Sequence, residues 1–136
     1  MLAIDLGQSG SRIRTAETLI NSTRGKLAGE PPLSSLRAVF EGIEKLSAHT
    51  VALSCTGFRG VVTDPQPFLA LCNEFFGATN VAVIDDGLAG YIGALGGANG
   101  VVLSIGGGVV SVGRNDSHFA HRDGLESTFG DEGGGF

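Results

Sequence analysis

A turn near the start of the chain has the residue types of a phosphate-binding turn. Asp5 and Leu6 end an apolar run, and the next residues are Gly7-Gln8-Ser9-Gly10-Ser11. Backbone N–H groups in such a turn can hold anionic oxygens, and the two serines add hydroxyl donors. A carboxylate repels phosphate, so Asp5 would act through Mg²⁺ and water, which bridge the two negative groups. Taken alone, the segment is better explained as an ordinary hairpin turn.

A second acidic position follows a predicted buried strand over residues 81–84. Asp85 and Asp86 come at its carboxyl end, which is where α/β sheets bind ligands. One of the two could be a general base that takes a proton from an attacking hydroxyl. Alternatively, one of them caps a short helix that begins at Gly87. Both interpretations can hold, because there are two residues.

Two further segments are rich in glycine. Gly106, Gly107 and Gly108 lie inside a strong hairpin pattern, where three glycines are costly for stability. Close approach of the backbone to a phosphate would offset that cost. The segment 130–135 sets Asp131 and Glu132 among glycines, which suits binding of sugar hydroxyls, the start of a helix or a flexible tail.

Other catalytic patterns are missing from the sequence. There is no G-x-x-x-x-G-K-[ST] phosphate loop, no G-x-G-x-x-G after a strand and no G-x-S-x-G. The three histidines are scattered and are expected in surface or loop roles. Cys55 and Cys72 fall in predicted buried elements, so we interpret them as reduced structural thiols.

The elements that must position these residues alternate in type. The pattern predicts the order β-β-β-α-β-α-β-α, followed by a new β-turn-β. The predicted strands cover residues 2–4, 11–16, 18–22, 51–55, 81–84, 101–105 and 109–112, with a further hairpin arm within 116–123. The predicted helices are an amphipathic one over 33–46, one capped by Asp64-Pro65 and closed by Gly77, and one from Gly87 to about Leu95. This order predicts an α/β fold with a mixed sheet and helices on its faces.

Composition excludes several classes of protein. The chain has 136 residues, 23 of them glycine, with 17% charged residues and a formal net charge of −5. The glycines have no collagen period, and no apolar run is long enough for a membrane-spanning helix. The net negative charge argues against a nucleic-acid partner. The glycines are uneven, since most of them fall after residue 86 and predict a loop-rich second part.

Four segments together resemble the actin-like ATPase superfamily. Residues 5–11 resemble its first phosphate motif, D-x-G-x-T-x-T, with Ser9 and Ser11 at the threonine positions. Asp86 matches the acid of the segment that ends the fifth strand, commonly N-D-A. Residues 105–108 resemble the second phosphate motif, G-T-G, with Gly107 where threonine is common. Residues 130–136 are similar to G-D-E-G-S-G-Y, which points to the branch of N-acetylglucosamine kinases and BadF/BadG/BcrA/BcrD ATPases.

The resemblance implies a role for each matching position. Asp5 would lie near Mg²⁺, and Asp86 would be the general base that activates the sugar hydroxyl. The terminal phosphates of ATP would be surrounded by two turns, made of Gly7, Gln8, Ser9, Gly10, Ser11, Gly106, Gly107 and Gly108. The sugar would contact Asp131, Glu132 and Gly133.

The resemblance also implies a longer protein. It predicts a ribonuclease H-like actin-ATPase domain over residues 1–98 and the start of a second similar domain over 99–136. The complete protein would phosphorylate an amino sugar, N-acetylglucosamine or glucosamine, with ATP and Mg²⁺, in the cytoplasm and as a homodimer. It would need neither nucleic acid nor membrane, and this chain alone would be inactive. The alternatives are an ATPase that activates a dehydratase through a shared iron–sulfur cluster, and a non-catalytic module that binds sugar or nucleotide.

Overall fold

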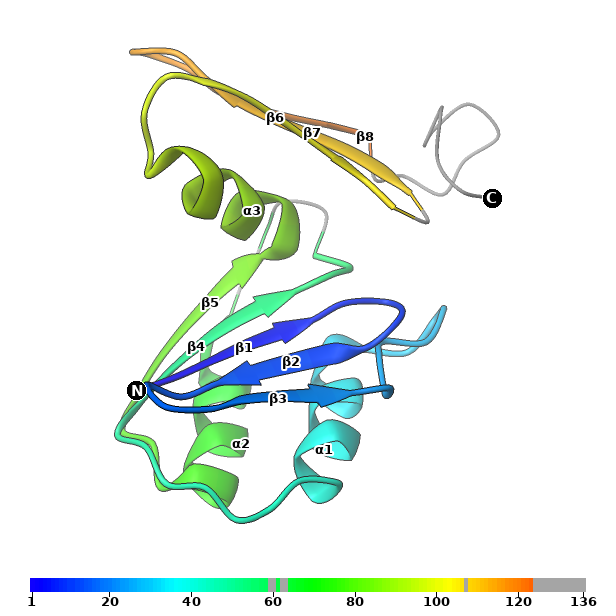
Figure 1. The fold of residues 1–136 in the computed structure, drawn as a ribbon, viewed down its shortest axis with the longest axis vertical. Coiled ribbons are helices and arrows are strands. Elements are labelled where there is room, and N and C mark those ends of the chain that lie inside the picture. Colours follow the sequence, from blue (N-terminus) through cyan, green and yellow to red (C-terminus); the bar gives the residue numbers. More distant parts are fainter. Residues whose placement is uncertain (59–60, 62–63, 107, 124–136) are drawn as a thin grey trace. The chain divides into compact units, whose positions relative to one another are not determined.

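The computed structural model describes residues 1–58, 61, 64–106 and 108–123 (Figure 1). The chain divides into two compact units, Met1–Asp86 and Gly87–Phe136. No helix within the described ranges combines the length and apolar character needed to cross a bilayer.

The first unit contains a five-stranded mixed sheet, as the sequence predicts. Its strands are β1 (Leu2–Leu6), β2 (Ser11–Arg14), β3 (Leu19–Ser22), β4 (Thr50–Cys55) and β5 (Asn80–Asp85). Their order in the sheet is β3-β2-β1-β4-β5. The first three strands form an antiparallel meander, whereas β1, β4 and β5 run parallel to one another. The carboxyl ends of the three parallel strands therefore meet at one edge of the sheet.

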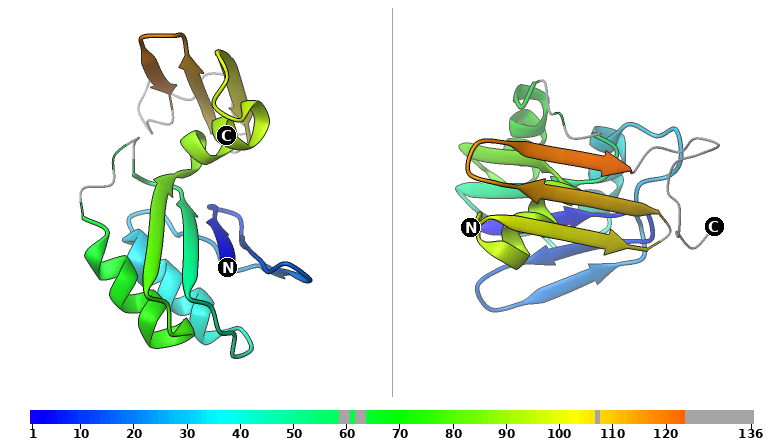
Figure 2. Two further views of the ribbon diagram at one scale, coloured as in Figure 1. Left: turned by 90° about the vertical axis from the view of Figure 1, so that its left-hand side faces the viewer. Right: turned by 90° about the horizontal axis from the view of Figure 1, so that it is seen from above.

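Helices α1 (Pro32–Glu41) and α2 (Gln66–Phe76) cover one face of this sheet (Figures 1 and 2). Alternate residues of the strands point toward the helices and are buried, as period-2 alternation requires. The core of this unit combines strand residues with residues of both helices: Leu2, Ile4, Leu6, Val51, Leu53, Leu36, Val39, Phe40, Phe68, Leu71 and Phe76. Asp5 and Ser54 occupy the intervening positions, so they lie on the face that α1 and α2 leave uncovered.

The first helix is shorter than the sequence pattern predicts. The apolar spacing runs from Leu33 to Leu46, but α1 ends at Glu41 and Gly42 follows as its C-cap. Glycine weakens a helix interior by about 1 kcal/mol, which is enough to stop a helix at this point. Ile43 and Leu46 still pack against the core from the connecting loop. The apolar period was therefore a correct guide to burial and a wrong guide to the end of the helix.

The second helix begins and ends as the sequence predicts. The Asp64 carboxylate accepts a hydrogen bond from the backbone N–H of Gln66 at 2.9 Å, within the first turn. Gly77 ends the helix in a left-handed conformation with φ of 69°.

The second unit contains an antiparallel sheet in the order β6-β7-β8. Its strands are β6 (Gly100–Ile105), β7 (Val109–Arg114) and β8 (Phe119–Asp123), and helix α3 (Asp86–Leu95) precedes them. The ring of Tyr91 in α3 packs edge-on against Phe119 at 5.8 Å between centroids. The Tyr91 hydroxyl also donates a hydrogen bond to the carbonyl of Ala98. These contacts fix the helix on one face of the small sheet.

Candidate functional site

The register of the parallel strands brings two predicted site segments to the same edge. Asp5 of β1 pairs with Ser54 of β4, and Cys55, one residue further along β4, pairs with Asp85 of β5. Neighbouring strands lie about 4.8 Å apart, so β1 and β5 are about 10 Å apart across β4. The predicted phosphate turn and the predicted acidic pair are thus separated by one strand.

Asp5 is held by two partners. Its Oδ1 accepts a hydrogen bond from the Ser54 hydroxyl at 2.9 Å, and its Oδ2 lies 3.2 Å from a guanidinium nitrogen of Arg12. The side chains of Arg12 and Asp5 are 69% and 41% exposed, so their ion pair contributes little to stability. The Asp5 carboxylate therefore remains partly open to solvent beside Arg12.

The donor set around Asp5 fits Mg²⁺. Mg²⁺ prefers oxygen ligands, keeps several waters, and is commonly held by one or two carboxylates together with substrate phosphates. The Asp5 carboxylate and the Ser54 hydroxyl are oxygen groups on the uncovered face of the sheet. Within the described ranges, no group of three or more His, Cys, Asp or Glu side chains could hold a metal ion by itself. The arrangement thus suits a cation shared with a phosphate ligand rather than a closed structural site.

The turn between β1 and β2 packs against the segment that follows β3. The Gly7 N–H donates to the Gly10 carbonyl at 3.0 Å, which closes the turn. Gly25 packs against its back, since a Cβ at Gly25 would lie 2.2 Å from the carbonyl oxygen of Gln8. The backbone N–H of Lys26 donates to the Gly7 carbonyl at 2.9 Å. The segment after β3 therefore sets the shape of the predicted phosphate turn.

The two serines of this turn have different environments. Ser9 and the neighbouring Gln8 are exposed, so their side chains are available to a ligand. Ser11 is buried, and its hydroxyl donates a hydrogen bond to the Arg24 carbonyl at 2.7 Å. In this conformation the Ser11 side chain ties the turn to the segment after β3.

The acidic pair divides between a strand and a helix. Asp85 is the last residue of β5 and is buried, whereas Asp86 is partly exposed and is the first residue of α3. A carboxylate in the first helical turn interacts favourably with the partial positive charge of the helix N-terminus. A helix thus begins at Asp86, one residue earlier than predicted, and Asp86 is partly exposed.

The Cys55 thiol, at the end of β4, lies near the carboxylates of Asp5, Asp85 and Asp86. Burial first, and then the nearby carboxylates of Asp5, Asp86 and Asp85, together raise the pKa of the Cys55 thiol to about 12. The strand register places these acids at the ends of β1 and β5, on either side of the end of β4. Sequence reasoning treated this cysteine only as a core residue.

The second glycine turn joins β6 to β7 in the second unit. The Gly106 N–H donates to the Gly108 carbonyl at 2.9 Å. A Cβ at Gly106 would meet no atom within 4 Å, and its φ does not lie in the left-handed region. Neither packing nor backbone conformation within the described residues requires glycine at this position. Gly107 and the segment with Asp131, Glu132 and Gly133 lie outside the described residues.

Three residues near the site were not singled out from the sequence. Ser54 and Arg12 bind the two oxygens of Asp5, and Lys26 lies beside the predicted phosphate turn. For Ser54 a signal was available, because it precedes the end of a buried strand beside Asp5. Arg12 and Lys26 gave none, since charged residues in strands and loops are common on any surface.

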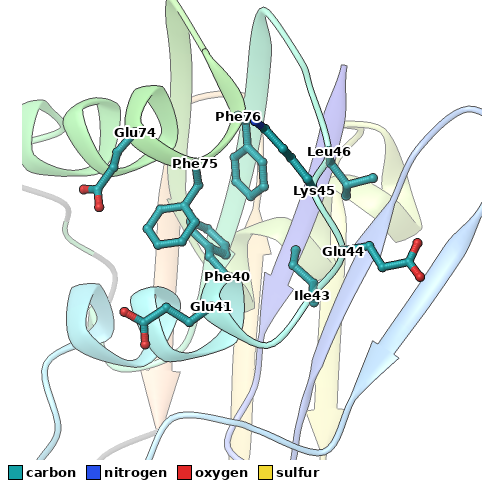
Figure 3. Close-up of a pocket in the computed structure, with 9 residues that line it drawn as sticks. All are labelled: Phe40, Glu41, Ile43, Glu44, Lys45, Leu46, Glu74, Phe75 and Phe76. Atoms are coloured by element: carbon teal, nitrogen blue, oxygen red, sulfur yellow. The ribbon is translucent and has the colours of Figure 1, made fainter.

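A pocket of about 320 Å³ lies elsewhere in the first unit (Figure 3). It is formed at the C-terminal ends of α1 and α2, and Phe40, Phe75 and Phe76 form its apolar wall. The Phe40 and Phe76 rings already pack on each other at 4.7 Å between centroids. This pocket lies at the opposite end of the helices from the strand edge with Asp5 and Asp86, so we do not assign it to the same site.

Comparison with solved structures shows the fold. A candidate N-acetylglucosamine kinase from Chromobacterium violaceum matches at 25% identity with a TM-score of 0.59, over 96% of this chain and 51% of that one. A candidate N-acetylglucosamine kinase from Porphyromonas gingivalis matches at 16% identity with a TM-score of 0.71, over 98% of this chain and 51% of that one. No family model and no curated protein matches the chain.

The chain thus has the fold of actin-like ATPases and spans about half the length of the solved structures that it matches.

Proposed function

We propose that this chain is the N-terminal part of an ATP-dependent sugar kinase that phosphorylates N-acetylglucosamine or glucosamine. The observation that carries the proposal is the placement of Asp5, its glycine–serine turn and Asp86 at the carboxyl ends of parallel strands of one mixed sheet. The likeness to the candidate kinase from C. violaceum supports it. Residues 1–98 would form the first domain and 99–136 the start of the second.

The residues at the carboxyl edge of the first sheet would serve different functions in phosphoryl transfer. Phosphoryl transfer depends on positioning and on stabilising charge, so the site needs backbone donors, a cation and a placed base. The turn from Gly7 to Ser11 would receive the terminal phosphates on N–H groups other than that of Gly7, which bonds the Gly10 carbonyl, and on the exposed Ser9 hydroxyl. When bound, Mg²⁺ would neutralise charge on these phosphates, and Asp5 with its water shell would hold it.

Asp86 would act as the general base. Its carboxylate would accept the proton of the attacking sugar hydroxyl while that oxygen forms its bond to the γ-phosphorus. The bond from the γ-phosphorus to the β–γ bridging oxygen breaks, and ADP leaves. The Gly106–Gly108 turn would contact the phosphates from the second domain. Asp131, Glu132 and Gly133 would bind sugar hydroxyls.

The proposal is tested with the complete natural protein that carries this chain. It is incubated with Mg²⁺, ATP and one of N-acetylglucosamine, glucosamine, glucose or buffer, and phosphorus NMR follows the products. We expect ADP and a sugar phosphate to form in equal amounts with an amino sugar. ADP release that is independent of every sugar would contradict the proposal.

A non-catalytic binding module is the second candidate. Gly107 stands where the family motif carries a threonine, so one hydroxyl donor to phosphate is missing. Calorimetry that shows sugar binding by the complete protein, without any turnover of ATP, would favour this candidate over the kinase.

The dehydratase-activator alternative receives no support from the cysteines. Cys55 and Cys72 are buried free thiols, and burial raises the pKa of Cys72 to about 11. A cluster ligand is a thiolate, so neutral buried thiols are poor ligands.

A further inference from the structure

The segment after β3 places one lysine beside the predicted phosphate turn. Gly25 has no room for a side chain, because a Cβ there would also lie 2.6 Å from the Gly10 nitrogen. The close approach brings the next residue, Lys26, against the turn, where its N–H bonds the Gly7 carbonyl at 2.9 Å. Figure 1 shows the turn between β1 and β2 alongside the segment that follows β3. The position of Lys26 is thus fixed by its backbone.

The side chain of Lys26 extends toward the end of β4. A Cβ built on Gly57 would lie 2.6 Å from Cε and 3.3 Å from Nζ of Lys26. Gly57 follows Thr56, whose N–H donates to the Leu6 carbonyl at 3.0 Å, so this position adjoins the end of β1. The ammonium group therefore lies where two parallel strands end, next to the turn that follows Asp5.

A network of hydrogen bonds holds the loop that carries this lysine. Glu30 accepts a hydrogen bond from the Arg24 guanidinium at 2.8 Å and another from the Ser35 hydroxyl of α1 at 2.5 Å. These interactions lower the pKa of the Glu30 carboxyl, the Ser35 hydroxyl most strongly. The loop is thereby tied to the helix that follows it, and Lys26 needs little reorganisation to meet a ligand.

The ammonium of Lys26 has no carboxylate partner in the described ranges. Arg12, Arg24 and Arg37 each form an ion pair there. Nζ of Lys26 instead makes one long hydrogen bond, 3.4 Å, to the carbonyl of the adjacent Leu27. A partly exposed cation in this position has its charge available to a ligand.

We propose that Lys26 binds the terminal phosphates of the nucleotide, as a point charge that complements the N–H groups of the Gly7–Ser11 turn. The inference deepens the proposed kinase function and rests on it. Lysine is a common phosphate ligand because its compact ammonium can donate to several oxygens at once. Asp5 and the phosphates are both negative, so a cation beside the turn reduces their repulsion.

Lys26→Met in the complete protein tests the proposal. Methionine keeps an unbranched apolar stem over Gly57 and removes the charge. We expect the dissociation constant of ATP, measured by calorimetry with Mg²⁺, to rise about tenfold, as for loss of one charge-assisted hydrogen bond. The affinity for adenosine should stay unchanged, because it has no phosphate.

Two further variants serve as controls. Lys26→Arg keeps the charge and should retain most of the ATP affinity. Lys45→Met makes the same charge change in the loop after α1, beside the pocket at the far end of the helices, and should leave ATP binding unchanged. Circular dichroism and the melting temperature of each variant establish that the fold is kept.

The outcomes separate this inference from the kinase proposal. Unchanged ATP affinity in Lys26→Met, or an equal loss in Lys45→Met, would overturn the role of Lys26, whatever the sugar assay shows. If the wild-type protein binds ATP but transfers no phosphate to any sugar, the kinase proposal fails. A tenfold effect in Lys26→Met would then still assign the lysine to a nucleotide site.

Discussion

Asp5 combines a weak ion pair with a place at the end of a buried strand. Its contact with Arg12 is largely exposed, while Ser54 fixes the other carboxylate oxygen. The carboxylate is thus oriented by a neutral partner and only loosely neutralised by a cation. This is the state expected of a residue that exchanges a guanidinium for a hydrated metal ion.

Asp5→Asn should weaken the binding of Mg²⁺ at the active site of the complete protein and so lower its activity. The amide keeps the size of the side chain and its contact with the Ser54 hydroxyl, but it loses the charge that attracts the cation. We expect kcat to fall about 100-fold, as for loss of one preorganised electrostatic contact. Steady-state rates across a Mg²⁺ titration measure this change. Wild-type rates at low Mg²⁺ would contradict the role of Asp5.

The two buried thiols predict a pH dependence of stability. The folded pKa values of Cys55 and Cys72, about 12 and about 11, lie above the ordinary value of 9.0. The native state therefore keeps these protons more tightly than the unfolded state does. Their contribution to stability is fully present below pH 9 and is lost as the pH rises through the folded pKa values.

Urea unfolding at a series of alkaline pH values measures this effect. The unfolding midpoint should fall between about pH 9 and pH 11, and the decline should be shallower in Cys55→Ala than in the parent chain. An identical pH profile for the two proteins would show that the Cys55 thiol titrates as an ordinary one.

At the scale of elements, the sequence was informative where local chemistry sets the boundary. Asp64 and Gly77 mark the limits of α2 because a carboxylate bonds the first turn and a left-handed residue ends the last one. The end of α1 was missed because apolar periodicity continues through Gly42 into a loop that still packs on the core. Gly42 was a local signal for this boundary, and the continuing apolar period masked it.

In the candidate site, too, some features follow from local residue types and others depend on contacts between segments distant in sequence. Asp5 and its turn, and Asp86 after a buried strand, could be proposed as candidates because their residue types and strand-end positions carry a chemical meaning. The support from Gly25 and Lys26 could not be foreseen, because it depends on a close approach between segments that are distant in sequence.

Gly25→Ala tests the support of the turn by the segment after β3. The added methyl would meet backbone atoms of Gln8, Gly7 and Gly10, which cannot move as a side chain end can. We expect a loss of about 1–3 kcal/mol in the free energy of unfolding, the usual cost of overpacking, measured by urea titration.

Gly90→Ala in α3 is the matched control. A Cβ at Gly90 would meet no atom within 4 Å, and alanine favours helix over glycine. This variant should be neutral or more stable by up to about 1 kcal/mol. Equal stability of Gly25→Ala and the parent chain would show that the turn is free to move away from Gly25.

At the scale of the whole molecule, strand β6 of the second unit carries a row of exposed apolar side chains. Val101, Leu103 and Ile105 alternate along β6 and are 71%, 57% and 66% exposed. Exposed apolar side chains in a row on a sheet promote association with another surface. A longer protein with the proposed second domain would provide such a surface within the same chain.

The isolated 136-residue chain should therefore self-associate and lack kinase activity. Sedimentation velocity at several concentrations measures the association, and Leu103→Ser should reduce it by interrupting the apolar row. The same preparation should form no sugar phosphate from ATP, since cleft closure needs two domains. ATP-dependent phosphorylation by this chain alone would overturn the two-domain proposal.

The most direct test of the account compares the complete wild-type protein with its Asp86→Ala variant, using N-acetylglucosamine, ATP and Mg²⁺. Sugar binding is followed by calorimetry, and sugar phosphate by phosphorus NMR. We expect the variant to bind the sugar still but to lose turnover, because the only group removed is the proposed base that accepts the hydroxyl proton. Turnover by Asp86→Ala at the wild-type rate would contradict the assignment of this strand edge as the phosphoryl-transfer site.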